Sequence, residues 1–551
     1  MAVSEESPPY PRRWATRLLF RGNAVSPWTL LSSVALLVVG LVITFTARDY
    51  GITWDEENHK IYGDLIIRWY TSLFADDAAV NQWRFYVYGG FFDAIAEAAA
   101  RLSPQGAYET RHAVNAVFGF LGLIAAYGAG RRLAGPAAGF FSAAFLAVTP
   151  IYYGQLFTNP KDIPFAALFT LSLFFMLRCV DSLPNPRTLD LLGLAAAMGA
   201  TMAVRIGGAV LLGYLAILWM AWLTLQMVPN RSLLPSKLKE ARSLALRFAL
   251  VALAAWAIML VWWPWAQVSP VLHPLEALTA TASYDWPLTV FFKGANLEAN
   301  NLPLSYLPTW FAITLPEFYF LAALAGCFLA VSWPRRRQWD SREHSGLLKI
   351  GLVAMAAFVP VATGMVLGTS LYDGIRQLTF VVPCLAVLAG SATAKVLASG
   401  IPRLPRWALA LGVFLSMGLT VYDMVELHPY EYIFFNRSVA GGLESAASRF
   451  DTDYYGASYR EGVQWLITNY RPDTTEKIRV ANSSKDFLTG YYLSMGEETQ
   501  RRFEPVSLSK DPHIYLSTTR WNRHLVDGKI LHVVSRKGVP LLYVIEFKPP
   551  S

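Results

Sequence analysis

Long apolar stretches recur along most of the chain and set its organisation. A helix that crosses a membrane needs about 20 mostly apolar residues, and by that measure the sequence predicts about eleven spans. These segments are residues 27–47, 113–130, 134–151, 163–180, 188–204, 206–227, 244–264, 309–332, 348–369, 377–398 and 406–425. The fold class that we expect is a polytopic α-helical membrane protein. The first run is long and lacks a clear small-residue cleavage pattern, so we interpret it as a retained anchor.

Two long loops separate some of these spans. The first loop, residues 48–112, has helical periodicity over 56–73 and 83–102, which suits helices lying at the membrane interface. The second loop, about residues 267–308, is rich in Pro, Trp and Asn.

The tail of the chain has a different pattern. From about residue 426, polar and apolar residues become mixed, as in a small soluble domain. The pattern predicts a helix over 460–467 and strands over 478–481, 530–534 and 541–547. We therefore expect two domains, a transmembrane module over 1–425 and a compact extracytoplasmic α/β domain over 426–551.

Composition and charge agree with a membrane protein. Hydrophobic residues make up 54% of the chain and charged residues 16%, with a mean hydropathy of +0.34, whereas soluble domains carry roughly 25% charged residues. The formal net charge of the chain is +8. The basic residues gather in alternate loops, such as the one holding Arg131 and Arg132. Because cytoplasmic loops are the basic ones, the N-terminus is expected inside and the C-terminal domain outside. Nucleic acid is not expected as a partner.

Sequence patterns typical of metal and nucleotide sites are not found. Cys179, Cys327 and Cys384 are too scattered for a disulfide framework or a metal cluster, and we expect them to be buried thiols. The eight histidines form no tight ligand pattern, so no zinc site is predicted. No phosphate-cradling Gly-rich loop follows a strand, which argues against nucleotide-driven transport.

The first candidate site is Thr53-Trp54-Asp55-Glu56-Glu57, directly after the first span. One interpretation is structural, because Thr53 and Glu56 have capping-box spacing and an acid in the first turn complements the helix dipole. The other is catalytic, with Asp55 facing a cavity and taking a proton from an acceptor.

Two further outer segments carry candidate residues. Asp162, in Asn159-Pro160-Lys161-Asp162-Ile163-Pro164, either caps the fourth span or joins Asp55 as a second site carboxylate. Arg376, in Leu371-Tyr372-Asp373-Gly374-Ile375-Arg376, either anchors the interface beside Tyr372 or binds a phosphate with its two-pronged guanidinium. Arg84 and Lys293 are outer cations with the same two alternatives. Arg205, between two apolar spans, is expected to be a snorkelling or structural cation.

An ordered series of segments runs through residues 27–470. It comprises Trp54-Asp55-Glu56, Arg111–Asn115 through Arg131–Gly135, Thr149-Pro150 followed by Asp162–Phe165, Tyr306–Pro308 with Leu315-Pro316, Tyr372–Arg376, His428–Tyr430 to Phe435-Asn436, and Asp453–Tyr455. The series resembles the lipid-linked glycosyltransferases with the GT-C fold. More narrowly, it resembles the bacterial phospholipid-carrier-dependent branch related to protein O-mannosyltransferases and lipid A aminoarabinose transferases. Where that family often has a Lys-Pro-Pro-like stretch, this chain has Arg84-Phe85-Tyr86-Val87-Tyr88.

The resemblance implies a function and a set of site residues. A hexosyl or pentosyl unit would move from a polyprenyl-phosphate donor to a lipid, glycan or protein acceptor on the outer face of the bacterial cytoplasmic (inner) membrane, with inversion. In three groups, the implied residues are Asp55, Asp162 and Glu56 for catalysis, Arg376, Arg84 and Lys293 for the donor phosphate, and Tyr88, Tyr372 and Asp373 as other site candidates.

The resemblance implies no cofactor beyond the lipid-linked donor, with a divalent cation between Asp55 and Asp162 as the alternative. A secondary transporter or flippase of an envelope lipid or glycan is the competing function, because transporters also place ionisable groups among their spans. A non-catalytic assembly partner acting through the tail is the third.

Overall fold

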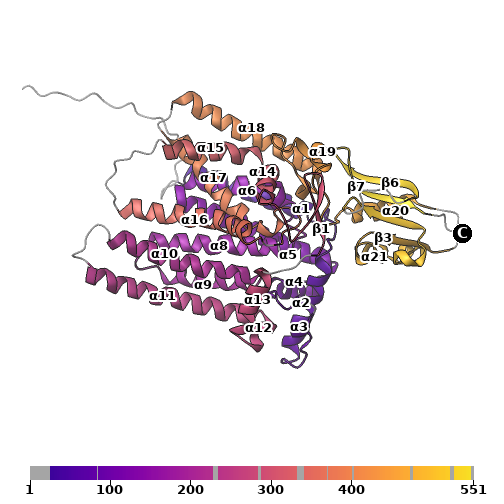
Figure 1. Cartoon of the computed structure of the whole chain (residues 1–551), viewed down its shortest axis with the longest axis horizontal. Coiled ribbons are helices and arrows are strands. Elements are labelled where there is room, and N and C mark those ends of the chain that lie inside the picture. The colour runs from indigo at the N-terminus through magenta and orange to yellow at the C-terminus, as the bar shows by residue number, and fades with distance from the viewer. Residues whose placement is uncertain are drawn as a thin grey trace, which may run out of the picture.

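The computed structural model describes residues 25–82, 85–227, 234–282, 287–331, 341–368, 370–399, 402–471, 476–520 and 527–547. In this part of the chain, eight helices are long and apolar enough to cross a membrane. They are α1 (Pro27–Thr46), α5 (Ala107–Ala134), α8 (Asp162–Asp181), α10 (Val210–Met227) with the short η1 (Ile206–Ala209), α11 (Leu234–Val261), α16 (Ser341–Leu367), α17 (Val381–Ala398) and α18 (Arg403–Leu427). Figure 1 shows them as one bundle.

Three of the predicted spans are short or broken. The helices α14 (Tyr306–Thr314) and α15 (Glu317–Val331) form one pair bent by 106° around Pro316. The helices α6 (Pro136–Ala147) and α9 (Thr188–Met202) are apolar but shorter than a typical span. Each predicted segment thus coincides with a helix or a bent helix pair, and the multi-pass helical fold class is confirmed. Cys179 and Cys384 are buried as expected, whereas Cys327 is exposed.

Short elements gather at the end of the bundle that faces the C-terminal domain (Figure 1). They are α2 (Glu56–Thr71), α3 (Ala78–Asn81), α4 (Phe91–Leu102), α7 (Pro150–Tyr153), α12 (Pro264–Val268), α13 (Leu272–Ala282), the hairpin of β1 (Thr289–Phe292) and β2 (Ala295–Glu298), and η3 (Arg376–Leu378). The helix expected from residue 56 is confirmed by α2. The one expected from residue 83 was placed too early, because Gly89 packs so close to the carbonyl of Ala203 that a Cβ would lie 2.0 Å from its oxygen, and α4 begins only at Phe91.

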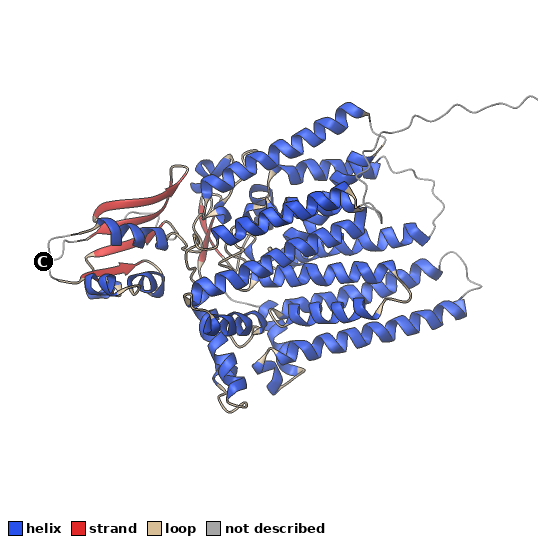
Figure 2. Cartoon of the chain, turned by 180° about the vertical axis from the view of Figure 1, so that it is seen from behind, coloured by secondary structure: helices blue, strands red, loops and turns tan. Residues whose placement is uncertain are grey.

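The C-terminal domain is a five-stranded sheet with helices on it (Figure 2). The strand order is β4-β3-β5-β7-β6, with β3 parallel to both β4 and β5 and the other pairs antiparallel. The elements are α20 (Tyr459–Asn469), β3 (Ile478–Asn482), α21 (Phe487–Leu493), α22 (Glu497–Arg502), β4 (Phe503–Pro505), η5 (Leu508–Lys510), β5 (Ile514–Thr518), β6 (Lys529–Arg536) and β7 (Val539–Glu546). The predicted helix and three predicted strands are confirmed as α20, β3, β6 and β7.

Residues 428–458 join the bundle to this domain and lie against both. This segment holds η4 (Glu431–Ile433) and α19 (Gly442–Ala447). Tyr50 donates its hydroxyl hydrogen to Glu431 at 2.9 Å, and the Asn436 N–H donates to the Ile313 carbonyl at 2.8 Å. At Gly51, a Cβ would lie 2.4 Å from the Ala457 carbonyl oxygen. The loop that follows α1 and the segment that leads into the C-terminal domain are therefore packed backbone to backbone.

Candidate active site

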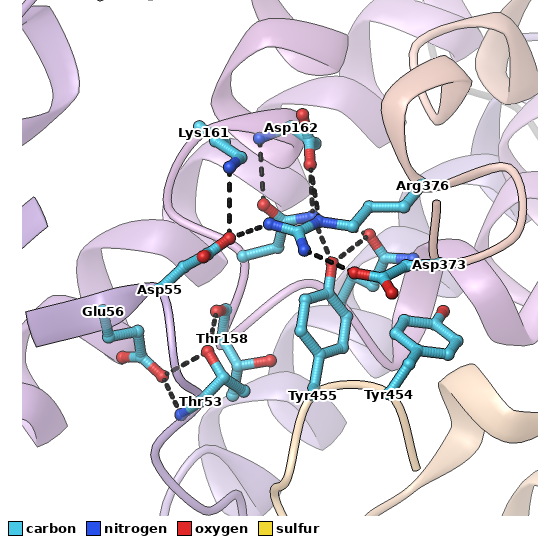
Figure 3. Close-up of polar contacts among 12 residues, drawn as sticks. Thr53, Asp55, Glu56, Thr158, Lys161, Asp162, Asp373, Arg376, Tyr454 and Tyr455 are labelled. Atoms are coloured by element: carbon cyan, nitrogen blue, oxygen red, sulfur yellow. Dashed lines mark hydrogen bonds and ion pairs between the residues drawn. The ribbon is translucent and has the colours of Figure 1, made fainter. Parts of the chain in front are cut away.

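Arg376 lies at the centre of a buried group of charges (Figure 3). Its side chain is only 2% exposed, and each guanidinium nitrogen donates to a different carboxylate. Nε donates to Asp162 at 3.3 Å, Nη1 donates to Asp373 at 2.8 Å, and Nη2 donates to Asp55. A buried guanidinium needs such partners, because an unpaired buried charge is strongly destabilising.

The start of α2 explains how Asp55 becomes available to Arg376. Glu56 takes the structural role there, accepting from the Thr53 N–H at 2.7 Å and from the Thr53 hydroxyl at 3.0 Å. Its other oxygen lies 2.7 Å from His112 Nε2. Asp55 makes no side-chain capping bond, and its carboxylate instead bonds Arg376 and, at 3.1 Å, Lys161. The described contacts of Glu56 are thus those of the helix-start alternative, and those of Asp55 are not.

At the start of α8, as at the start of α2, one residue bonds the helix backbone and another directs its carboxylate into the charged group. The side-chain oxygen of Asn159 accepts from the N–H of Asp162, the first residue of the helix, at 3.0 Å. Asp162 is therefore left to accept from Asn159 Nδ2 at 3.0 Å, from Arg376 and from Arg205. The ion pair with Asp162 gives Arg205, whose side chain is 16% exposed, a structural partner as expected. These contacts are not those of the alternative in which Asp162 only caps the helix.

The loop before α17 presents the third carboxylate. Asp373 and Gly374 both have left-handed backbone angles, with φ of 61° and 68°, a conformation that Gly adopts freely and Asp tolerates. This turn directs Asp373 at Arg376 on one side and at Arg520 of the C-terminal domain on the other. Burial raises the pKa of Asp373 to about 6, and Arg520 opposes that rise.

We call the seven ion-paired groups the charge cluster: Asp55, Asp162, Asp373, Lys161, Arg205, Arg376 and Arg520. With every group ionised, its three carboxylates and four cations leave one positive charge in excess. Asp55 is the most exposed of the three acids, at 25% of its side chain against 2% for Asp162 and 0% for Asp373. The cluster can therefore attract an anion and offers one carboxylate to a substrate.

Aromatic rings border the charge cluster. The Arg376 guanidinium lies 4.8 Å from the ring centre of Tyr455 and 5.8 Å from that of Tyr372. Lys161 Nζ lies 5.8 Å from the ring centre of Tyr88. Such cation–π contacts hold charged groups where water is scarce. Tyr455 is further fixed by Asn159, which donates to its hydroxyl oxygen at 2.8 Å.

The structure joins most of the predicted site residues, whereas Glu56, which bonds Thr53 and His112, and Lys293 lie outside the charge cluster. Asp55, Asp162, Asp373 and Arg376 meet in the charge cluster, with Tyr372 and Tyr88 beside it. Lys293 lies exposed in the β1–β2 turn, with its Nζ 5.1 Å from the ring centre of its neighbour Phe292. Among the described contacts, none joins Lys293 to the charge cluster. Arg84, and the basic residues Arg12, Arg13, Arg17, Arg21, Arg231, Arg335, Arg336 and Arg337, lie outside the described residues.

Sequence patterns alone assigned no role in the site to Lys161, Arg205, Tyr455 and Arg520. A lysine beside a candidate aspartate, and an arginine between two apolar spans, are signals that a carboxylate partner lies near. No signal in the local sequence singles out Arg520, because its partners lie 147 and 66 residues away.

The space between Asp55 and Asp162, where the sequence allowed a divalent cation, holds the guanidinium of Arg376. Within the described ranges, no group of three or more His, Cys, Asp or Glu side chains is arranged to hold a metal ion.

Comparisons with known proteins place this arrangement in context. Residues 97–265 match the family model described as dolichyl-phosphate-mannose-protein mannosyltransferase. The crystal structure of ArnT from Cupriavidus metallidurans in the apo state is 16% identical, with a TM-score of 0.50 over 93% of this chain and 97% of that one. The chain has the GT-C fold. This confirms the resemblance seen in the sequence at the level of the fold.

Other structures with this GT-C fold are less similar. ArnT from C. metallidurans bound to undecaprenyl phosphate is 16% identical, with a TM-score of 0.49 and coverage of 95% of this chain and 98% of that one. The apo oligosaccharyltransferase of Archaeoglobus fulgidus is 13% identical, with a TM-score of 0.46 and coverage of 87% and 65%. No curated protein matches the chain.

Proposed function

We propose that the protein is a membrane glycosyltransferase that moves a sugar from a polyprenyl phosphate to an acceptor on the outer face of the bacterial cytoplasmic membrane. The observation that carries the proposal is the position of Asp55. It is the one carboxylate of the charge cluster with substantial exposure, 25% of its side chain, and it lies among cations that suit a phosphate.

The proposed reaction is a single displacement at the anomeric carbon. Asp55 takes the proton of an acceptor O–H or N–H, and the acceptor's lone pair forms the new bond to that carbon. The bond between the carbon and the donor phosphate oxygen breaks, and its electron pair leaves with the polyprenyl phosphate. Attack opposite to the leaving group inverts the configuration of the sugar, which is a hexose or a pentose.

Cations of the charge cluster supply the electrostatic part of this mechanism. The departing phosphate gains negative charge, which fixed positive groups stabilise without reorganising. Arg376 remains our candidate, although a phosphate that reached it would have to displace or share one of its three carboxylates. Lys161 and Arg205 each have one carboxylate partner among the described ion pairs and more exposure, 10% and 16%. We add both to the predicted phosphate ligands.

The family match supports a lipid-phosphate donor. The matched range, residues 97–265, contains Lys161, Asp162 and Arg205, and the matching family is described by a dolichyl-phosphate-mannose donor. A transporter or flippase typically binds its substrate near the bilayer midplane through broken helices. Here the charge cluster forms instead where the start of α8 meets the residue before α2, the loop before α17 and Arg520 of the C-terminal domain.

A deletion strain tests the proposal even though the acceptor is unidentified. Its envelope lipids and glycans should lack one sugar by mass spectrometry, and those extracts then serve as acceptors. Purified protein in nanodiscs is given undecaprenyl phosphate carrying mannose, another hexose or a pentose. We expect release of undecaprenyl phosphate together with gain of the missing sugar, from the wild type and not from Asp55→Asn. Movement of an intact lipid-linked sugar across vesicles, with no sugar transferred, would establish the flippase instead.

A further inference from the structure

Arg520 belongs to the C-terminal domain, two residues after β5. Its side chain nevertheless contacts three other segments of the chain that lie in or beside the charge cluster. Its Nη2 donates to Asp373, and its Nη1 donates to the carbonyl oxygen of Tyr454. Its guanidinium also lies 4.2 Å from the ring centre of Trp54. The side chain is 3% exposed, so these contacts are made out of water, where ionic hydrogen bonds are strongest.

Each of the three contacted residues is bonded to, or next in the chain to, a residue of the candidate site. Asp373 bonds Arg376 at 2.8 Å. Tyr454 precedes Tyr455, whose ring lies 4.8 Å from the Arg376 guanidinium. Trp54 precedes Asp55 in the chain, and its N–H donates to the Tyr455 carbonyl at 3.4 Å. Arg520 thus bonds Asp373, which also pairs with Arg376, and the residue before Tyr455, and its guanidinium lies over the ring of the residue before Asp55.

We infer that Arg520 is a positioning residue through which the C-terminal domain holds Arg376 and Asp55 in their working geometry. The inference rests on the proposed glycosyltransferase function and gives the C-terminal domain a part in it. Arg520 acts through Asp373, Tyr454 and Trp54 and does not itself touch the reacting atoms.

The pH profile separates this role from a merely structural one. Because the pKa of Asp373 is about 6 and Arg520 lowers it, loss of the Arg520 charge raises that pKa further. Asp373 then takes up its proton at a higher pH and releases its ion pair with Arg376, so the acidic limb of the activity profile moves to higher pH. The titratable and charged groups that face Asp373 are Arg376, Arg520, Lys161, Asp451, Tyr306, Tyr454 and Tyr455.

Arg536 provides a matched control. It is also an arginine of the C-terminal domain that faces the connecting segment, with its guanidinium 4.6 Å from the ring centre of Tyr430. Within the domain, its Nη2 lies 2.7 Å from Glu461 of α20. Its Nε donates to the His428 carbonyl at 3.0 Å. Arg536→Gln therefore removes a comparable interdomain link that lies away from the charge cluster.

The experiment compares full-length wild type, Arg520→Gln, Arg520→Lys, Asp373→Asn, Arg520→Gln/Asp373→Asn and Arg536→Gln in nanodiscs. We expect Arg520→Gln to lower kcat by about tenfold to 10²-fold, as a small misplacement of catalytic groups does, and to shift the acidic limb upward. Arg520→Lys should recover part of the loss, and Arg536→Gln should match the wild type in both readouts. The double variant should be little worse than the poorer single variant, because both act through one contact.

A second readout does not depend on turnover. Hydrogen exchange over residues 52–55 and 370–376 should rise in Arg520→Gln and stay at the wild-type level in Arg536→Gln. Equal exchange, kcat and pH profile in the two variants would overturn the inference while leaving the proposed function intact. If the wild type transfers no sugar from any of the tested undecaprenyl-phosphate sugars, the proposed function fails, and the exchange data still decide whether Arg520 orders the two segments.

Discussion

Asp55 and Thr53 are two residues apart and give opposite predictions. The change Asp55→Asn keeps size and shape but removes proton acceptance, and general-base catalysis typically contributes about 10²–10⁴ in rate. Thr53→Ala removes the hydroxyl whose single hydrogen is shared between Glu56 at 3.0 Å and the Thr158 carbonyl at 2.9 Å, and loss of such a hydrogen bond typically costs about 0.5–1.5 kcal/mol. We expect Asp55→Asn to abolish sugar transfer with its melting temperature nearly intact, and Thr53→Ala to melt slightly lower with measurable turnover. Near-wild-type turnover in Asp55→Asn would remove Asp55 from the catalytic role.

The Arg376 guanidinium is expected both to stabilise the fold and to bind the donor phosphate. Its variants should therefore change both the melting temperature and sugar transfer. In Arg376→Ala, three carboxylates lose a common partner, and breaking a buried ion pair typically costs about 3–5 kcal/mol. Arg376→Lys keeps the charge, but its three N–H donors share one nitrogen and cannot reproduce the planar guanidinium fork that reaches three carboxylates. We expect no transfer from Arg376→Ala, and partial transfer with a raised KM for the donor from Arg376→Lys, measured beside melting curves. A KM for the donor equal to that of the wild type in Arg376→Lys would contradict the phosphate role.

The residues of the site were only partly predictable, for a reason that lies in their sequence separation. Asp55, Asp162 and Arg376 stand out because charges beside apolar spans need an explanation. Their pairing joins positions 214 and 321 residues apart, which local patterns cannot reveal. Local patterns also could not reveal the role of Arg520, because only the fold brings it to its partner Asp373.

At the scale of elements, the spans were predictable because lipid imposes a simple rule. A segment that crosses hydrocarbon must bond its backbone internally and present apolar side chains, and both demands are visible in the sequence. In the C-terminal domain, β5 was missed because its residues Ile514–Thr518 are buried on both faces and so show no alternation. Strand β4 has only three residues, which is too short for a periodic signal.

The start of α2 gives an element-scale prediction. Glu56 holds this helix start by accepting from Thr53 and by pairing with His112. Glu56→Ala leaves buried donors without their acceptor, which typically costs about 1–3 kcal/mol. We expect a lower melting temperature and, in the folded fraction at low temperature, transfer within a few-fold of the wild type. A loss as large as that of Asp55→Asn, with melting unchanged, would return Glu56 to the catalytic candidates.

At the scale of the whole molecule, the bundle brings the site and the C-terminal domain to one end. The residue before α2, the start of α8 and η3 meet in the charge cluster through Asp55, Asp162 and Arg376, and the C-terminal domain supplies Arg520. The other end holds basic residues, among them Arg132, 2.9 Å from Asp181, and Lys349, paired with the same aspartate. This separation agrees with the charge pattern of the sequence, from which the basic loops are expected on the cytoplasmic side.

The side of the membrane on which the site lies is our last prediction. If the basic end is cytoplasmic, a fusion after residue 551 places its reporter outside, whereas a fusion in the loop between α8 and α9, residues 182–187, places it inside. We expect alkaline phosphatase, which needs an oxidising compartment to form its disulfides, to be active in the first fusion and inactive in the second. A reporter that fluoresces only in the cytoplasm should give the reverse pattern, and it controls for expression. Activity of both phosphatase fusions, or of the loop fusion alone, would contradict the orientation. If the loop fusion alone were active, the charge cluster would face the cytoplasm, and an acceptor of the envelope surface could not reach Asp55.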